Sequence, residues 1–274
     1  MTQAQKAELF RELHQGGRIL VLPNAWDVAS ARVFEEAGFP AIATTSAGVA
    51  AVFGYPDGQH ISSGLMLDMV RRIADAVAVP VTADVEAGYD DPLQTALAAM
   101  EAGAAGMNLE DALDDNPAAL KDLASQVELI RLIRARTNLV INARTDIFLS
   151  QIGEPATRLR RTVERLNAYR DAGADSLFAP GVSDAETIGQ LAKMVRGPLN
   201  ILAVNGTPPI AALQELGVAR VTIGSGAMRA TLGLARRIAH ELAGQGTYAS
   251  FTEGAIPYAD VNHMLKAKAK PASQ

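Results

Sequence analysis

The chain has 274 residues, of which 49% are hydrophobic and 20% charged, so it can bury a large core and is not expected to be disordered. A net charge of −5 argues against binding to nucleic acid or to an anionic membrane surface. The absence of cysteine excludes disulfides, cysteine-ligated zinc and cysteine nucleophiles. No apolar run reaches the length of a membrane span, and residues 1–17 lack the apolar core of a signal peptide, so we expect a soluble, cytoplasmic protein.

Short β-branched segments alternate with longer amphipathic segments along the chain, the order typical of parallel α/β proteins. Eight strands are predicted, at residues 19–22, 41–45, 81–83, 106–109, 140–143, 176–179, 199–203 and 220–223. Helices are predicted near residues 27–38, 64–77, 91–102, 117–136, 155–172, 184–195, 207–216 and 226–243. Eight such units favour an α/β fold of the (β/α)8 TIM-barrel type, and we expect residues 1–274 to form a single barrel domain. Residues 247–265 are predicted to be an extra C-terminal helical segment outside the barrel.

Carboxylates follow two neighbouring predicted strands. Asp84 and Glu86 are two residues apart on an extended segment, so their side chains point the same way, into the barrel mouth. Together with Glu110, after the next strand, they form an oxygen-rich site suited to Mg²⁺. An alternative is that Asp84 and Glu86 cap the helix that begins near Asp90.

A cationic side chain ends the fifth predicted strand. Arg144 can bind a carboxylate or stabilise developing negative charge at the barrel centre. It can instead form a structural ion pair with Asp146 or Glu110, and the two roles are compatible, since a buried arginine needs a partner.

Small residues follow the second predicted strand. Thr45, Ser46, Ala47 and Gly48 allow backbone N–H groups to approach an anion, which makes this turn a candidate substrate-binding segment. His60, on the loop that follows, is a minor acid/base candidate, and its alternative is a solvated loop histidine.

Six short motifs in this order resemble the isocitrate lyase/phosphoenolpyruvate mutase superfamily over residues 22–230. They are Leu22-Pro-Asn-Ala-Trp-Asp27, Thr45-Ser-Ala-Gly48, Gly54-Tyr-Pro-Asp57, Ala83-Asp-Val-Glu-Ala-Gly88, Asn108-Leu-Glu-Asp111 and Ala143-Arg-Thr-Asp146. The resemblance implies Mg²⁺ held mainly by Asp84, with Glu86 and Glu110 acting partly through water. It implies that Asp57 lies near the metal and, in some members, near the chemistry, and that the substrate carboxylate meets the backbone at Ser46 and Ala47. Arg144 would contact the substrate from the opposite wall, and Asn205 matches a substrate-binding asparagine after a one-residue shift.

The resemblance also implies a homotetramer built from dimers that exchange C-terminal helices, with residues 247–265 as the expected site of exchange. True isocitrate and methylisocitrate lyases carry a Lys-Lys/Arg-Cys-Gly-His stretch on a loop after strand four, which this chain lacks. The matching residues 111–117 are shorter and have no cysteine, histidine or lysine, so the usual lyase reactions are not expected. This segment is instead predicted to act as a lid that excludes water.

A Mg²⁺-dependent enzyme that cleaves a C–C bond of a small 2-oxo or 2-hydroxy (di)carboxylate through an enolate, as a lyase or hydrolase, is the predicted function. One alternative is C–P chemistry on phosphonopyruvate, by a mutase or hydrolase. Another is a protein that binds 2-oxoglutarate or pyruvate without turnover. A Schiff-base aldolase is disfavoured because no lysine lies at a predicted strand end.

Overall fold

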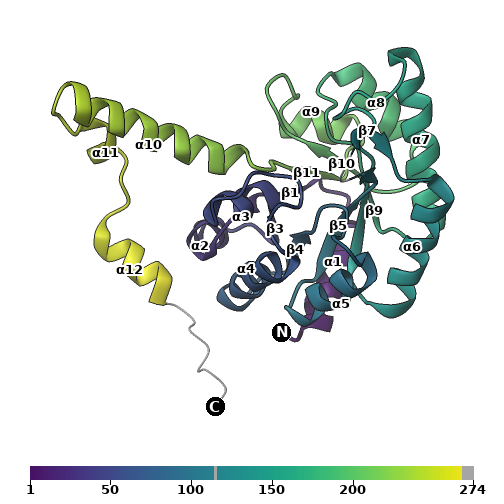
Figure 1. Cartoon of the computed structure of the whole chain (residues 1–274), viewed down its shortest axis with the longest axis horizontal. Coiled ribbons are helices and arrows are strands. Elements are labelled where there is room, and N and C mark those ends of the chain that lie inside the picture. The colour runs from purple at the N-terminus through teal and green to yellow at the C-terminus, as the bar shows by residue number, and fades with distance from the viewer. Residues whose placement is uncertain (114–115, 267–274) are drawn as a thin grey trace.

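The computed structural model describes residues 1–113 and 116–266, and within them a parallel sheet closes into a barrel (Figure 1). The sheet order is β1-β11-β10-β9-β8-β5-β4-β3-β2. The strands that form it are β1 (Leu20–Leu22), β2 (Asn24–Ala25), β3 (Ile42–Thr44), β4 (Val81–Asp84), β5 (Gly106–Glu110), β8 (Val140–Arg144), β9 (Ser176–Phe178), β10 (Leu199–Leu202) and β11 (Arg220–Thr222).

Closure of the barrel depends on β1 and β2, which are consecutive and separated by Pro23. β1 pairs with β11, and β2 pairs with β3, so the two segments act as one strand that joins the two ends of the sheet. A proline can stand between them because it has no N–H to donate to a neighbouring strand. Counted this way, the barrel has the eight strand positions expected from the sequence.

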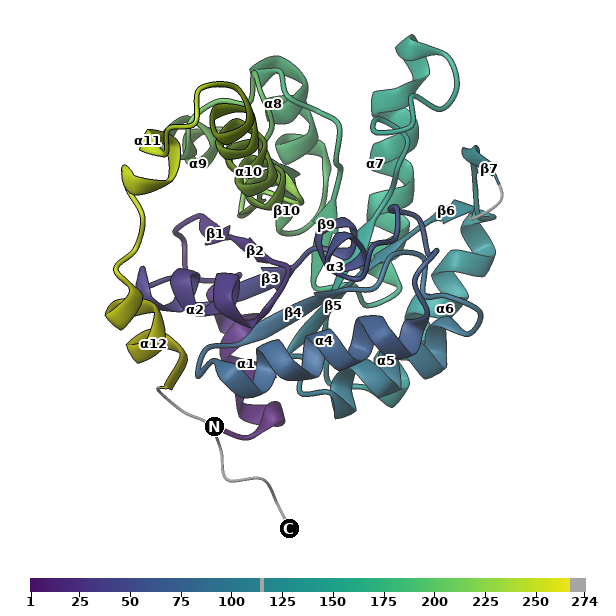
Figure 2. The ribbon, with the colours of Figure 1, turned by 60° about the vertical axis from the view of Figure 1, so that its left-hand side comes forward.

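Helices surround the barrel (Figures 1 and 2). Those on its outside are α2 (Val28–Glu36), α4 (Ser63–Ala76), α5 (Pro92–Glu101), α6 (Leu123–Arg136), α7 (Pro155–Asp171), α8 (Ala185–Met194) and α9 (Ile210–Glu215). At the N-terminal end of the strands, α1 (Gln3–Leu13) packs Ala7 and Phe10 against the buried Leu20, Leu22 and Val140. The barrel is therefore closed below, and polar side chains at its other end are left for function.

The eight predicted strands match β1, β3, β4, β5, β8, β9, β10 and β11 to within one residue at each end, and the short β2 was not predicted. The predicted helix at 117–136 is wrong in its first part: α6 begins at Leu123, and residues before it form an antiparallel hairpin of β6 (Ala112–Leu113) and β7 (Asn116–Leu120). The N-cap accounts for this start, because the side chain of Asp122 accepts the N–H of Ser125. A short helix, α3 (Ser46–Val52), was not predicted.

The C-terminal part of the chain leaves the barrel. α10 (Gly226–Gly244) extends away from it as an arm, α11 (Ala249–Thr252) follows at its tip, and α12 (Tyr258–Lys266) returns to pack against α2 (Figure 1). On the arm Leu232 is 56% and Leu242 48% exposed. No helix among the described residues combines the length and the hydropathy needed to cross a membrane.

Candidate active site at the barrel mouth

A cavity of about 60 Å³ lies at the C-terminal ends of the strands. Its polar wall is formed by Asn24, Asp84, Asn108, Arg144 and Thr222, and its apolar wall by Leu149, Phe178, Pro180 and Leu202. These residues come from seven of the eight strand positions or the loops after them, which is how a barrel of this kind assembles a site. The cavity has room for a ligand of a few heavy atoms.

Asp84 is the best-ordered acid of the mouth. It ends β4 and is 8% exposed. Its Oδ2 accepts hydrogen bonds from the backbone N–H of Ser46 at 3.0 Å and from Ser46 Oγ at 2.9 Å, while Oδ1 accepts from Asn108 Nδ2 at 3.2 Å. A carboxylate held by three donors is fixed in orientation, which suits a metal ligand.

Glu86 follows on a strained turn. Its backbone has φ +54°, a left-handed conformation that is uncommon for residues other than glycine. The carboxylate accepts the backbone N–H of Gln59 at 2.7 Å, and Tyr89 N–H donates to Gln59 Oε1 at 2.6 Å. Burial, and then the negative charges of Asp84 and Asp57, raise the pKa of Glu86 to about 7. Glu86 therefore lies close enough to Asp84 and Asp57 to be affected by their charges, whereas the convergence of Asp84, Glu86 and Glu110 on one metal stays a prediction.

The helix-cap alternative for these acids is wrong. The next helix, α5, is capped by Asp91, whose Oδ1 accepts the N–H groups of Leu93 and Gln94. Gly88, with φ +95°, makes the turn between Glu86 and this helix. A Cβ at Gly88 would lie 2.4 Å from Cβ of Pro92, so the close approach of the turn to α5 requires glycine.

Arg144 forms both of the ion pairs that were considered for it. Its Nη1 lies 2.6 Å from Glu110 Oε2, while Nε and Nη2 donate to the two carboxylate oxygens of Asp146 at 2.5 and 2.8 Å. The guanidinium also lies over the ring of Phe178, 5.9 Å from its centroid. Burial raises the pKa of Glu110, and the positive charge of Arg144 opposes that rise. Burial alone would lower the pKa of Arg144, but the negative charges of Glu110 and Asp146 hold it above its usual range.

The structure thus brings Asp84 and Arg144 to one cavity, with Glu110 bonded to Arg144. Asp57 lies in the exposed loop after α3, where partial desolvation and then the charge of Asp84 raise the pKa of its carboxyl. Asn205 is exposed on the loop after β10 and does not line the cavity. His60 borders a separate cavity of about 520 Å³, beside Tyr89.

The segment after β3 has a partly structural role. Ser46 bonds Asp84, as above, whereas Thr45 caps α3 by accepting the N–H of Gly48 at 3.4 Å. Gly48 is required by packing, because a Cβ there would lie 2.6 Å from Thr45 Cγ2 and 2.7 Å from Trp26 Cβ. Ala47 lies in the first turn of the helix, where backbone N–H groups are available to an anion.

Two asparagines of the site were not predicted to be site residues. Asn108 donates to Asp84 and accepts from Asn142 Nδ2 at 2.7 Å, and Asn24 Oδ1 accepts the N–H groups of Ile223 and Gly224. Their signal in the sequence was a polar residue at an inward position of an otherwise apolar strand. The predicted lid at 111–117 lies partly outside the described residues.

The donor set fits a hard divalent cation. Asp84 offers an ordered carboxylate, and the negative charges of Asp84 and Asp57 both raise the pKa of Glu86, a repulsion that a cation would relieve. Over residues 1–113 and 116–266, no three acidic or histidine side chains are arranged around a common point. Mg²⁺ keeps several waters and takes one or two carboxylates directly, so Asp84 and one neighbouring acid would be enough to hold it.

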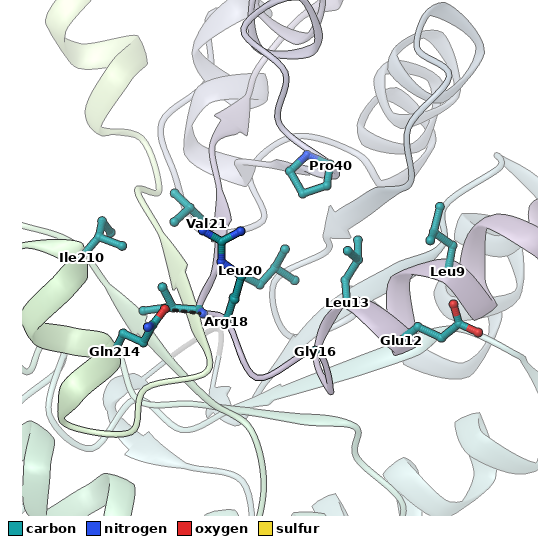
Figure 3. Close-up of a pocket in the computed structure, with 11 residues that line it drawn as sticks. Leu9, Glu12, Leu13, Gly16, Arg18, Leu20, Val21, Pro40, Ile210 and Gln214 are labelled. Carbon is teal, nitrogen blue, oxygen red and sulfur yellow. Dashed lines mark hydrogen bonds between the residues drawn. The ribbon is translucent and has the colours of Figure 1, made fainter.

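A larger cavity, of about 630 Å³, lies at the opposite end of the barrel between α1, the start of β1 and α9 (Figure 3). Its lining is mostly aliphatic, including Leu9, Leu13, Val21 and Ile210. None of the predicted site residues lines it, so its size does not make it the candidate active site.

The chain is similar to known proteins over most of its length. Residues 10–243 match the family model described as phosphoenolpyruvate phosphomutase. The chain is 30% identical over 260 residues to a 2-methylisocitrate lyase of Halalkalibacterium halodurans, covering 90% of this chain and 85% of that protein. A crystal structure of a Burkholderia cenocepacia protein is 36% identical with a TM-score of 0.89 and 97% of both chains covered. A phosphonopyruvate hydrolase, crystallised with oxalate and Mg²⁺, shares the fold at a TM-score of 0.84 and 23% identity, covering 96% of this chain and 95% of that one.

Proposed function

Because the chain belongs to the phosphoenolpyruvate phosphomutase family, within the isocitrate lyase/phosphoenolpyruvate mutase superfamily, we propose a Mg²⁺-dependent carbon–carbon lyase or hydrolase. Its substrate is a small 2-oxo or 2-hydroxy (di)carboxylate, and the bond breaks through an enolate. The observation that carries the proposal is one small cavity with a buried, oriented carboxylate, Asp84, and a partly buried arginine, Arg144, in its walls.

Asp84 would hold the metal, with Glu86 and Glu110 contributing partly through water. When bound, Mg²⁺ polarises the 2-oxo group as a Lewis acid. Ser46 and Asn108 keep the Asp84 carboxylate in place by donating to it. Burial and nearby negative charges raise the pKa of Glu86. A bound cation would offset those charges and favour the ionised form of Glu86.

Arg144 would meet the substrate carboxylate and balance the charge that develops as the bond to C3 breaks. Asp146 accepts hydrogen bonds from Nε and Nη2, along one edge of the guanidinium, so the orientation is set before the substrate arrives. The backbone at Ser46 and Ala47 would meet the substrate carboxylate from the other side, with Thr45 and Gly48 shaping that turn. The Ser46 N–H already donates to Asp84, so the N–H of Ala47 would make the direct contact. Asp57 would act near the metal. Asn205 is a proposed substrate contact that needs movement of its loop.

The size and charge of the cavity indicate a small substrate. Arg144 is the one basic side chain among the described residues that line it. From Asp111 to Leu120 the sequence contains no lysine, arginine, histidine or cysteine. A tricarboxylate would place several negative charges beside Asp84 and Glu110 with few donors to balance them, so a mono- or dicarboxylate fits better.

Two alternatives remain within the same site. C–P cleavage or transfer on phosphonopyruvate, as a mutase or hydrolase, is supported by the family model and by the shared fold with a phosphonopyruvate hydrolase. A member that binds 2-oxoglutarate or pyruvate without turnover is supported by the absence of an acid/base side chain of the lyase type in the segment after β5.

Assembly is proposed to be a homotetramer with exchanged C-terminal helices, in the cytoplasm. The arm formed by α10 extends away from its own barrel with leucines exposed, which is the geometry of a helix that packs on another copy. The exchange predicted for residues 247–265 would then begin earlier in the chain, at α10.

A panel assay tests the reaction. The protein would be incubated with Mg²⁺ and oxaloacetate, 2,3-dimethylmalate, 2-methylisocitrate or phosphonopyruvate, and products followed by proton and phosphorus NMR. C–C cleavage products from a small acid, lost on adding EDTA, are expected. Release or transfer of phosphorus from phosphonopyruvate alone would establish C–P chemistry. Tight binding without any product would establish a protein that binds 2-oxo acids without turnover.

A further inference from the structure

A buried polar network lies behind Arg144, away from the cavity. Its centre is Asp111, which directly follows β5 and is fully buried. Asp111 Oδ1 accepts the backbone N–H of Asp146 at 3.1 Å. Its Oδ2 accepts Nε of Arg165 at 2.7 Å and the hydroxyl of Tyr169 at 2.6 Å. Both carboxylate oxygens are therefore used, and by different elements.

The outer side of this network is on α7. Arg165 and Tyr169 are one helical turn apart, with Nε of Arg165 2.9 Å from the Tyr169 hydroxyl. Arg165 Nη2 also donates to the carbonyl of Lys121 at 2.6 Å, and Lys121 N–H donates to the Asp111 carbonyl at 2.8 Å. Asp111 is thus fixed between α7 and the start of α6.

The inner side of the network reaches the cavity. Asp146, whose N–H is held by Asp111, binds the Arg144 guanidinium through both carboxylate oxygens. We propose that Asp111 is a positioning residue: held by Arg165 and Tyr169, it fixes the segment at Asp146 and thereby the orientation of Arg144 in the barrel mouth. Asp111 touches neither the cavity nor Arg144, so it acts through Asp146. The functional consequence rests on the proposed role of Arg144 in substrate binding.

Competition for Arg144 explains why such a support is needed. Glu110 and Asp146 both bond the guanidinium, from opposite ends of the fork. If the segment at Asp146 were free to shift, the attraction of Glu110 would pull the Arg144 guanidinium toward β5. The guanidinium would then leave its place over the ring of Phe178. A rotation of that size at a planar, bidentate donor loses hydrogen bonds to a bound carboxylate.

Three variants test the proposal. Asp111→Asn keeps an acceptor for the Asp146 N–H but loses the charge that holds Arg165, and Tyr169→Phe removes one bond to Asp111 while keeping the ring. Arg134→Met is the control, because Arg134 forms a comparable, partly buried ion pair with Asp175, away from the mouth. Each would be measured by crystallography without ligand, by calorimetry with Mg²⁺ and oxalate, and by urea denaturation.

We expect Asp111→Asn to displace Asp146 and Arg144 in the crystal and to weaken oxalate binding about 3- to 30-fold, with a smaller loss for Tyr169→Phe. Arg134→Met should lower stability and leave oxalate affinity unchanged. An Arg144–Asp146 pair that is unmoved in both Asp111→Asn and Tyr169→Phe would overturn the proposal. If Asp111→Asn does not fold, Tyr169→Phe decides alone. If the wild-type protein binds no oxalate, the proposed function fails, while the crystal comparison still decides the positioning role.

Discussion

Arg144 neutralises two buried carboxylates and is also the proposed contact for the substrate carboxylate. With Glu110 and Asp146 both bonded to it, truncation to Met leaves two buried carboxylates without a cation. We predict that Arg144→Met lowers the free energy of unfolding by about 3–5 kcal/mol, and that Arg144→Lys, which keeps the charge, costs less. Both variants should lose oxalate binding, since lysine cannot reproduce the planar fork. Urea denaturation and calorimetry would separate the two effects, and a Lys variant that binds as wild type would contradict this assignment.

His14 provides a pH dependence unconnected with the mouth. Burial, and then the positive charge of Arg220, lower the pKa of His14 from 6.5 to about 4. The unfolded chain therefore takes up a proton at a higher pH than the folded protein does. This contribution to stability is complete above about pH 6.5 and is lost as the pH falls toward about 4, by up to about 3 kcal/mol. Urea unfolding at a series of pH values should show this loss in the wild type relative to His14→Phe; parallel curves would refute it.

At the scale of elements, the turn from β4 into α5 positions Asp84 and Glu86. It depends on Gly88, where φ is +95° and a Cβ would meet Pro92. We predict that Gly88→Ala destabilises the protein by roughly 1–3 kcal/mol, through backbone strain and the close contact. Gly64→Ala, in the first turn of α4 with open space around it, should be neutral or slightly stabilising in the same thermal melt. Equal melting temperatures for the two variants would show that the turn is not strained.

Elements differed in how well their sequences predicted them. The barrel strands are buried apolar runs bounded by proline, glycine or charged residues, so their positions follow from local pattern. Residues 117–120 of β7 were mistaken for the start of a helix, because alanine and leucine carry no strand signal and the pairing of β6 with β7 depends on register rather than on periodicity. Asp111, Arg165 and Tyr169 could not be connected from the sequence, since contacts over 54 and 58 residues are set by the closed barrel.

At the scale of the whole molecule, the order of strands in a barrel was enough to predict that most candidate site residues lie near one another. Asp84, Glu86, Glu110 and Arg144 follow neighbouring strands, so their approach required the topology alone. Their individual partners required coordinates: Glu110 bonds Arg144, and Glu86 bonds the Gln59 backbone. The direction of α10 could not be predicted from the sequence either. A helix that leaves its barrel has the same amphipathic sequence as a helix that packs on the barrel.

The exposed arm leads to a prediction about assembly. Leu232→Glu with Leu242→Glu places charges on two exposed leucines of α10 and should shift the protein to a smaller species in light scattering. Leu132→Glu, on α6 of the barrel wall and 44% exposed, is the matched control and should leave the assembly intact. A wild-type mass near 28.8 kDa, that of a single chain, would refute the exchange of helices.

The account as a whole requires a metal-dependent anion site at Asp84. Calorimetry of oxalate binding to the wild type and to Asp84→Asn, with Mg²⁺ and with EDTA, tests it most directly. The wild type should bind oxalate with Mg²⁺ and not with EDTA, and Asp84→Asn should bind at least about 100-fold more weakly, because the ordered metal ligand is lost while the shape of the cavity is kept. Equal affinities in the two proteins, or binding that persists in EDTA, would contradict the account.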